Sequence, residues 1–184
     1  MNTNHTSGLA LDIDDTLSWT CREWAECLHA EFGNPENLTP QEFVDRYRLT
    51  QHAPYFQRDD ILVRIREMCF DPAFHDGVAV IEDALPALKK IEKIIPIGAY
   101  LTARPESVRA STQQWLSRHN FPEAELIMCP DERPLGTAGE WKAQVLEESY
   151  PGIVGIVDDN PSFLSISQPS TKVSYSYIIM TQAM

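Results

Sequence analysis

A short apolar run near the start of the chain ends in two closely spaced carboxylates. Residues 9–11 are apolar and lead into Asp12 and Asp14, and Thr16 follows two residues later. Such a run is typical of a short strand buried inside a parallel sheet. Because a buried carboxylate is costly unless it holds a metal or a specific partner, a strand that delivers two of them indicates a binding site. In open α/β sheets, binding sites lie at the carboxyl ends of the strands.

From Val78 onward, predicted helices and strands alternate along the chain. Strands are predicted over residues 94–101, 126–128 and 153–157, with an edge strand over 172–179. Helices are predicted over residues 84–91 with Asp83 as the N-cap, over 105–119 with Val108, Trp115 and Leu116 inward, and over 138–148. This alternation predicts an α/β fold with a doubly wound parallel sheet.

The stretch between the first strand and this region is predicted to be helical. Trp24, Cys27, Leu28 and Phe32 are spaced for one face of a helix, and Ile61, Leu62, Ile65 and Met68 for one face of another. Between them, residues 39–42 read as a capping box with proline at the first helical position. The predicted organisation is therefore a core made of residues 1–17 and 80–184, interrupted by a helical insert over 18–79.

Composition limits the partners and the compartment that we expect. The 184 residues carry a net charge of −12, which argues against a nucleic-acid polymer as partner. No apolar run approaches the ~20 residues that cross a bilayer, so no membrane association is expected. Residues 1–7 do not resemble a signal peptide, which favours the cytoplasm. The four scattered cysteines are expected to be buried free thiols.

Further polar residues fall at the other strand ends or on the helix between them. Thr102 ends one predicted strand, Lys142 lies on the helix after it, and Asp158 and Asp159 follow the strand over 153–157. An aspartate can attack a phosphoryl group and form an aspartyl-phosphate, which makes Asp12 the candidate nucleophile. A second acid two residues later can protonate the leaving oxygen and then activate water, so Asp14 is the candidate general acid and base.

The order and spacing of these motifs resemble the haloacid dehalogenase (HAD) superfamily of phosphatases. The resemblance covers the core on both sides of the insert and implies a metal site for Mg²⁺, the cofactor we expect. It assigns the metal ligands to Asp12, the backbone carbonyl of Asp14 and Asp158, since Mg²⁺ favours oxygen ligands. It further implies that Thr102 binds a phosphoryl oxygen and that Lys142 offsets the charge of carboxylates and phosphate.

Two acids of these motifs have less definite roles. In the family the second acid of the last motif contacts metal-bound water or orients the lysine, which would place Asp159 in the metal site. A helix N-cap or a surface acid is the alternative for Asp159. Asp15 stands where the family commonly has glycine, and we interpret it as part of the loop structure.

Arg104 points to one branch of the superfamily. Residues 102–105 read Thr-Ala-Arg-Pro before a helix, which looks like the 5'(3')-deoxyribonucleotidase-like branch, and phosphatases of the polynucleotide-kinase type show a similar arginine. An arginine at a helix N-terminus suits a phosphate, so Arg104 is expected to bind substrate. Pairing with a neighbouring acid is the alternative.

The position of the insert matches the helical C1 cap that closes over the site in this superfamily. A cap of this kind favours small substrates over proteins. Its aromatic residues are expected to form its own core, with stacking on a base as the alternative, and its basic residues to be solvated, with phosphate or sugar binding as the alternative. The aromatic set is Trp19, Trp24, Tyr47, Tyr55 and Phe56, and the basic set is Arg46, Arg48, His52 and Arg58.

The expected function is Mg²⁺-dependent hydrolysis of a small phosphomonoester, with a nucleoside monophosphate as the leading substrate. Sugar phosphates and other metabolites are alternatives, as is a non-catalytic binding protein of the same fold. A phosphonatase would need a lysine from the cap, and none occurs before Lys89. A response-regulator receiver would place its lysine after the acids, whereas Lys142 precedes the last acidic pair.

Overall fold

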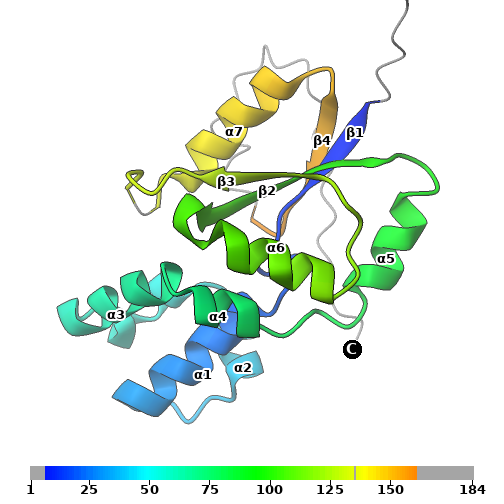
Figure 1. Ribbon diagram of the computed structural model, residues 1–184. Coiled ribbons are helices and arrows are strands. Elements are labelled where there is room, and N and C mark those ends of the chain that lie inside the picture. Colours follow the sequence, from blue (N-terminus) through cyan, green and yellow to red (C-terminus); the bar gives the residue numbers. More distant parts are fainter. Residues whose placement is uncertain (1–6, 135, 161–184) are drawn as a thin grey trace, which may run out of the picture.

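The core of the protein is one parallel sheet, as the computed structural model shows for residues 7–134 and 136–160. Its four strands lie in the order β3-β2-β1-β4 (Figure 1). They are β1 (Gly8–Leu11), β2 (Ile97–Pro105), β3 (Glu125–Cys129) and β4 (Ile153–Val157). The predicted α/β class with a parallel sheet is confirmed, and the edge strand expected over residues 172–179 lies outside the described part.

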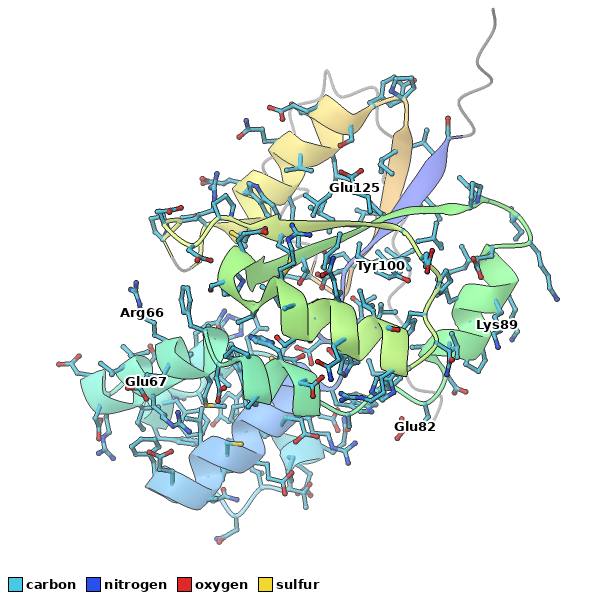
Figure 2. All side chains as sticks on the ribbon, viewed as in Figure 1. Arg66, Glu67, Glu82, Lys89, Tyr100 and Glu125 are labelled. Atoms are coloured by element: carbon cyan, nitrogen blue, oxygen red, sulfur yellow. The ribbon has the colours of Figure 1, made fainter. Side chains whose placement is uncertain are left out.

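Helices cover both faces of the sheet because successive side chains of each strand point to opposite sides. Leu11 and Val157 join the apolar cluster of α5 (Ala84–Ile91) and α6 (Arg109–Arg118). Ala10 and Ile156, their neighbours in sequence, pack instead on α7 (Ala138–Ser149) across the sheet. Figure 2 shows Tyr100 in the interior, between the sheet and α6, whereas Lys89 extends outward from α5.

The residues after β1 form a group of helices with an apolar core of their own. This insert holds α1 (Thr20–Phe32), α2 (Pro40–Tyr47), η1 (Thr50–His52), η2 (Pro54–Phe56), α3 (Asp59–Cys69) and α4 (Pro72–Gly77). The capping box predicted at the start of α2 is formed in full by Thr39 and Glu42. Within the described ranges, no helix is both long and apolar enough to cross a membrane.

The two ends of the insert lie side by side. Ser18 forms an antiparallel bridge with Val80, and the Trp19 amide donates to the Ala79 carbonyl at 2.9 Å. Trp115 of α6 is completely buried, and its Nε1 donates to the Val78 carbonyl at 2.7 Å. The helical insert therefore leaves and re-enters the core at one place. The exact domain boundaries, 1–17, 18–79 and 80–184, stay a prediction.

The elements around β2 differ from those predicted. The strand begins at Ile97 rather than at Ile94, because the amides of Ile94 and Ile95 both donate to the Ile91 carbonyl and extend the turn after α5. It also continues past Thr102 to Pro105, which pairs with Cys129 of β3 after a register shift. The following helix consequently starts later, with a 3₁₀ turn, η3 (Glu106–Val108), before α6.

Three smaller expectations were wrong. Leu62 is exposed, because it lies one step around α3 from the buried row formed by Ile61, Ile65 and Met68. Cys27 is exposed on α1 and Cys69 is only partly buried, although all four cysteines are free thiols as expected. Asp83 precedes α5 without a capping side-chain hydrogen bond. Its backbone is already helical, whereas a capping residue normally has extended backbone that lets its side chain reach the first turn.

Replacing Trp115 with alanine should strongly destabilise the protein. The change removes a fully buried indole and leaves the Val78 carbonyl without its donor, so we expect a loss of about 3–5 kcal/mol in the free energy of unfolding. Denaturant unfolding measures this loss. Ile94→Ala is the control, because Ile94 is 87% exposed and should change the free energy by less than about 0.5 kcal/mol. Equal effects of the two variants would contradict the assigned core.

Candidate active site at the strand ends

The parallel pairing of β1 and β4 brings two aspartates together. Leu11 is in register with Val157, and each is followed directly by an acid, Asp12 or Asp158. The Asp12 amide donates to the Val157 carbonyl at 2.9 Å, which carries the pairing one residue beyond β1. Both acids are almost completely buried. The carboxyl ends of these two adjacent strands thus create a place of concentrated negative charge.

Lys142 of α7 binds both of these aspartates. Its Nζ donates to Asp12 Oδ1 at 2.6 Å and to Asp158 Oδ2 at 2.7 Å. The lysine side chain is itself 7% exposed, so the three charged groups form a buried, hydrogen-bonded cluster. Burial by itself would lower the pKa of Lys142, but the charges of Asp12 and Asp158 outweigh burial and raise it. The lysine is therefore a cation at neutral pH.

A third acid completes a group that could hold a metal ion. One carboxylate oxygen from each of Asp12, Asp158 and Asp159 lies within 4.8 Å of the others. The Asp159 amide donates to Thr16 Oγ1 at 3.1 Å, and the Asn160 amide donates to Asp158 Oδ1 at 2.8 Å, so the loop after β4 is fixed at the site. Oxygen ligands of this kind suit a hard cation such as Mg²⁺. Asp14 contributes no carboxylate oxygen to this group.

The charge balance of the cluster also fits a bound cation. Burial, followed by repulsion from Asp158, Asp14 and Asp159, raises the pKa of Asp12 even though Lys142 opposes the shift. Burial and the charge of Asp158 likewise raise the pKa of Asp159 to about 6. Lys142 alone thus leaves surplus negative charge among the three carboxylates, and a divalent cation would remove it.

Asp14 lies in a different electrostatic environment, although it is only two residues from Asp12. Its Oδ1 accepts from Arg104 Nε at 2.9 Å, from Arg104 Nη2 at 2.8 Å and from Thr20 Oγ1 at 2.6 Å. Thr102 Oγ1 lies 3.4 Å from Oδ2. Burial favours the protonated acid, but the charge and hydrogen bonds of Arg104 outweigh it and lower the pKa of Asp14 to about 2.

Arg104 is a buried member of the site. Its side chain is 1% exposed, its guanidinium carbon lies 5.6 Å from the Trp115 ring centroid, and its Nη2 also donates to Ser18 Oγ at 3.3 Å. Its Nη1 is buried without a hydrogen-bond partner among the described residues. In this structure Arg104 pairs with an acid, the alternative considered for it, and contact with a substrate phosphate stays a prediction.

Asp15 shapes the loop that directly follows the two catalytic candidates, Asp12 and Asp14. Its backbone has φ of 57°, a region that glycine enters more readily, and its Oδ1 accepts from the Cys21 amide at 2.9 Å. Burial raises the pKa of Asp15 to about 7. The side chain is thus anchored at the start of α1, and it is not one of the three metal-binding candidates.

Four polar residues around the site were not assigned a role from the sequence. Thr16 and Thr20 hold Asp159 and Asp14 as described above, and Ser18 donates to the Ile13 carbonyl at 3.1 Å. His75 of α4 is 2% exposed, and burial together with the charge of Arg104 lowers its pKa. Thr16 belongs to the first motif, so its spacing was a usable signal, whereas nothing in the sequence marks the position of His75.

Most aromatic and basic residues of the insert stay within the insert. The aromatic residues pack on its own apolar core, apart from Trp19, which packs on the core of the sheet domain. Arg46 pairs with Glu36 and Arg58 with Asp60. His52 Nδ1 lies 2.9 Å from the Tyr47 carbonyl oxygen. Arg48 differs, because its guanidinium donates to the backbone carbonyl of Asp159.

Comparison with solved structures finds the same fold in a larger assembly. A chain of the structure described as that of the Pnkp1/Rnl/Hen1 RNA repair complex matches with a TM-score of 0.55 over 97% of this chain, at 14% sequence identity. A chain described under the Pnkp1/Rnl/Hen1 complex matches with a TM-score of 0.52 over 96%, also at 14% identity. This protein spans 44% and 47% of those chains, less than half of their length.

Sequence comparison adds no relative to this structural likeness. No family model matches the chain, and no curated protein matches it. At 14% identity the two solved structures share the fold with this protein, and the chemistry must be argued from its own residues.

The contact between Arg104 and Asp14 predicts an acid-base effect that can be measured without substrate or metal. In Arg104→Met, burial acts on Asp14 unopposed, so its pKa should rise from about 2 to above the ordinary value of 3.8. In the wild type the folded pKa lies below the unfolded one. Ionised Asp14 therefore stabilises the protein above about pH 4, and this contribution is lost as the pH falls toward 2.

A carboxyl NMR titration of Asp14 in the metal-free protein tests this effect. Arg109→Met is the matched control, because Arg109 forms its ion pair with Glu106 on the surface. An Asp14 pKa that stays near 2 in Arg104→Met would show that another group holds this carboxylate ionised.

Proposed function

We propose that this protein is a phosphohydrolase of the HAD type that requires Mg²⁺ and cleaves a small phosphomonoester. The observation that carries the proposal is the buried cluster in which Lys142 holds Asp12 and Asp158 at the ends of adjacent parallel strands. In chain order, the first acid, the lysine and the last acids follow one another as the motifs of the superfamily do. The α/β fold shared with chains of an RNA repair complex supports the same assignment.

In this mechanism Asp12 is the nucleophile. One of its carboxylate oxygens attacks phosphorus, the ester P–O bond breaks, and the departing oxygen takes a proton, leaving an aspartyl-phosphate. Water then attacks the phosphorus, gives its proton to a base, and releases phosphate and free Asp12. Thr102 would donate a hydrogen bond to a phosphoryl oxygen, and Lys142 would offset the charge that gathers between Asp12 and the phosphate.

Asp14 is the residue that moves protons in both steps. The ion pair with Arg104 keeps it ionised in the ligand-free protein, which is the form that accepts a proton from water. Acting first as an acid requires a higher pKa. If the guanidinium of Arg104 transfers to the substrate phosphate, Asp14 loses its cation and its pKa rises. The two interpretations of Arg104, as partner of an acid and as phosphate ligand, thereby become successive states of one cycle.

The metal would be held by Asp12, Asp158 and Asp159, with the backbone carbonyl of Asp14 as a further ligand implied by the resemblance. When bound, Mg²⁺ supplies positive charge that brings the anionic phosphate next to a carboxylate nucleophile. The three acids fit this role because they are close together and mostly buried, and they carry more charge than Lys142 balances.

A nucleoside monophosphate is the leading substrate, and sugar phosphates or other small metabolite phosphates are alternatives. The insert follows β1 directly, as a C1 cap does, and such a cap favours small substrates. A second candidate is a phosphorylated RNA end. It is favoured by the likeness to chains of an RNA repair complex and by Arg104, although the net charge of −12 opposes binding of a polymer.

Phosphate release in the presence of Mg²⁺ tests the proposed activity. The panel should contain nucleoside monophosphates, sugar phosphates, p-nitrophenyl phosphate and a short RNA with a terminal phosphate. We expect metal-dependent release that is lowered at least about a thousandfold in Asp12→Asn, because a nucleophile cannot be replaced by an amide of the same shape. Asp45→Asn, an exposed position on α2, is the matched control and should retain full activity.

The outcomes separate the candidates. Preferential release from nucleoside monophosphates supports the nucleotidase assignment, and preferential release from the RNA end supports the repair role. Full activity of Asp12→Asn would refute the mechanism. Absence of release from every substrate, together with retained Mg²⁺ binding in calorimetry, would favour the non-catalytic binding protein.

A further inference from the structure

Arg48 has an unusual backbone conformation at the end of α2. Its φ and ψ are 63° and −46°, and the Leu49 amide donates across it to the Tyr47 carbonyl at 2.7 Å. These are the features of a classic γ-turn, which is rare and strained for a residue with a side chain. A residue with the conformational freedom of glycine would meet the same turn with less strain. The presence of arginine here indicates that the side chain has a use.

The side chain of Arg48 extends from the insert to the loop that carries the metal-binding candidates. Its Nη2 donates to the backbone carbonyl oxygen of Asp159 and lies 3.7 Å from Asp159 Oδ2. Because the hydrogen bond is made to the carbonyl, the contact leaves the carboxylate oxygens of Asp159 available to a metal. Arg48 is thus attached beside the candidate metal centre without occupying it.

The other arginines of the insert that form ion pairs do so within the insert. Arg46, two residues away, pairs with Glu36, and Arg64 pairs with Glu31 and Glu67. Arg118 of α6 also crosses between the two parts, but it reaches Asp76 of α4, which is not one of the metal-binding candidates. Among the ion pairs of the described residues, the pair of Arg48 and Asp159 is therefore the one that links the insert to the acid cluster.

We propose that Arg48 is a positioning residue that docks the helical insert onto the loop after β4 and so fixes the substrate-binding side of the site. The docking itself does not depend on the proposed function; only its effect on the kinetics rests on that function. Without the guanidinium, the turn after α2 loses its attachment to Asp159, and the insert is held against the loop after β4 less of the time. Substrate binding then weakens, whereas the reaction of bound substrate depends on Asp12, Asp14 and Lys142, which are unchanged.

Kinetics of Arg48 variants with Mg²⁺ and p-nitrophenyl phosphate test this consequence. In Arg48→Ala we expect KM to rise about tenfold, as loss of one charged hydrogen bond predicts, and kcat to change less than about threefold. Arg48→Lys keeps the charge without the planar fork and should fall between Arg48→Ala and the wild type. Arg46→Ala is the matched control and should leave both constants unchanged. A large loss of kcat at unchanged KM in Arg48→Ala would overturn the positioning role.

Hydrogen exchange of the same variants tests the docking without any activity. Amides of residues 47–53 should exchange faster in Arg48→Ala than in the wild type or in Arg46→Ala. This result would uphold the docking even if no phosphate ester were hydrolysed, so the two proposals fail separately. Unchanged exchange in Arg48→Ala would overturn the docking.

Glycine at position 48 separates the strain of the turn from the contact. Arg48→Gly and Arg48→Ala both lack the guanidinium, but glycine relieves the positive φ, so Arg48→Gly should unfold at a higher temperature than Arg48→Ala. A lower unfolding temperature for Arg48→Gly would show that the backbone at this position is unstrained and would remove that part of the argument.

Discussion

The buried bridge from Lys142 to Asp12 and Asp158 is the interaction on which the site depends. Two carboxylates at the ends of adjacent strands would repel each other in an apolar interior, and removing the cation between them would leave uncompensated buried charge. The lysine reaches them because α7 packs against the sheet through its apolar residues Trp141 and Leu146. Fold and site are therefore not separable here, since the helix that completes one apolar layer also supplies the cation.

The ion pair of Arg104 and Asp14 gives two acids that are close in sequence, Asp12 and Asp14, different electrostatic environments. Asp12 faces Lys142 and two other carboxylates, and its pKa is raised, whereas Asp14 faces Arg104, and its pKa is lowered to about 2. Directly after Asp14, the positive φ of Asp15 helps to turn the chain. Pairs of titratable groups whose environments push their pKa values apart are typical of sites where one group reacts and the other moves a proton.

The helical insert stands at the end of the sheet where these charges gather. Figure 1 shows α1–α4 grouped below the sheet, separate from α7 on the far side. Its own apolar core makes it a compact unit, and its two chain connections meet at the bridge between Ser18 and Val80. A unit attached in this way needs further contacts to hold an orientation. Arg48 and Arg118 supply such contacts at two different places, of which only the first is at the acid cluster.

The sequence by itself determined the type of fold and the list of acids. Apolar runs that end in Asp12 and in Asp158 specify buried parallel strands, because a short strand covered on both faces has to be apolar along its length. The predicted bounds of β4 and the predicted start of α7 at Ala138 also agree with the structure, because the local pattern of apolar and polar residues sets them. The extent of β2 was misjudged, since a turn at residues 94 and 95 depends on hydrogen bonds to Ile91 rather than on apolarity.

Only the tertiary structure decided how the charged groups are paired. Spacing could place Arg104 near the site but could not choose between a phosphate and Asp14, because the guanidinium pairs across 90 residues of sequence. The same holds for Arg48 and Asp159, which are 111 residues apart, and for the burial of His75 next to Arg104. Local sequence fixes which residues are apolar, helical or extended, whereas the partner of a buried charge is set by whichever opposite charge the packed elements bring within hydrogen-bonding distance.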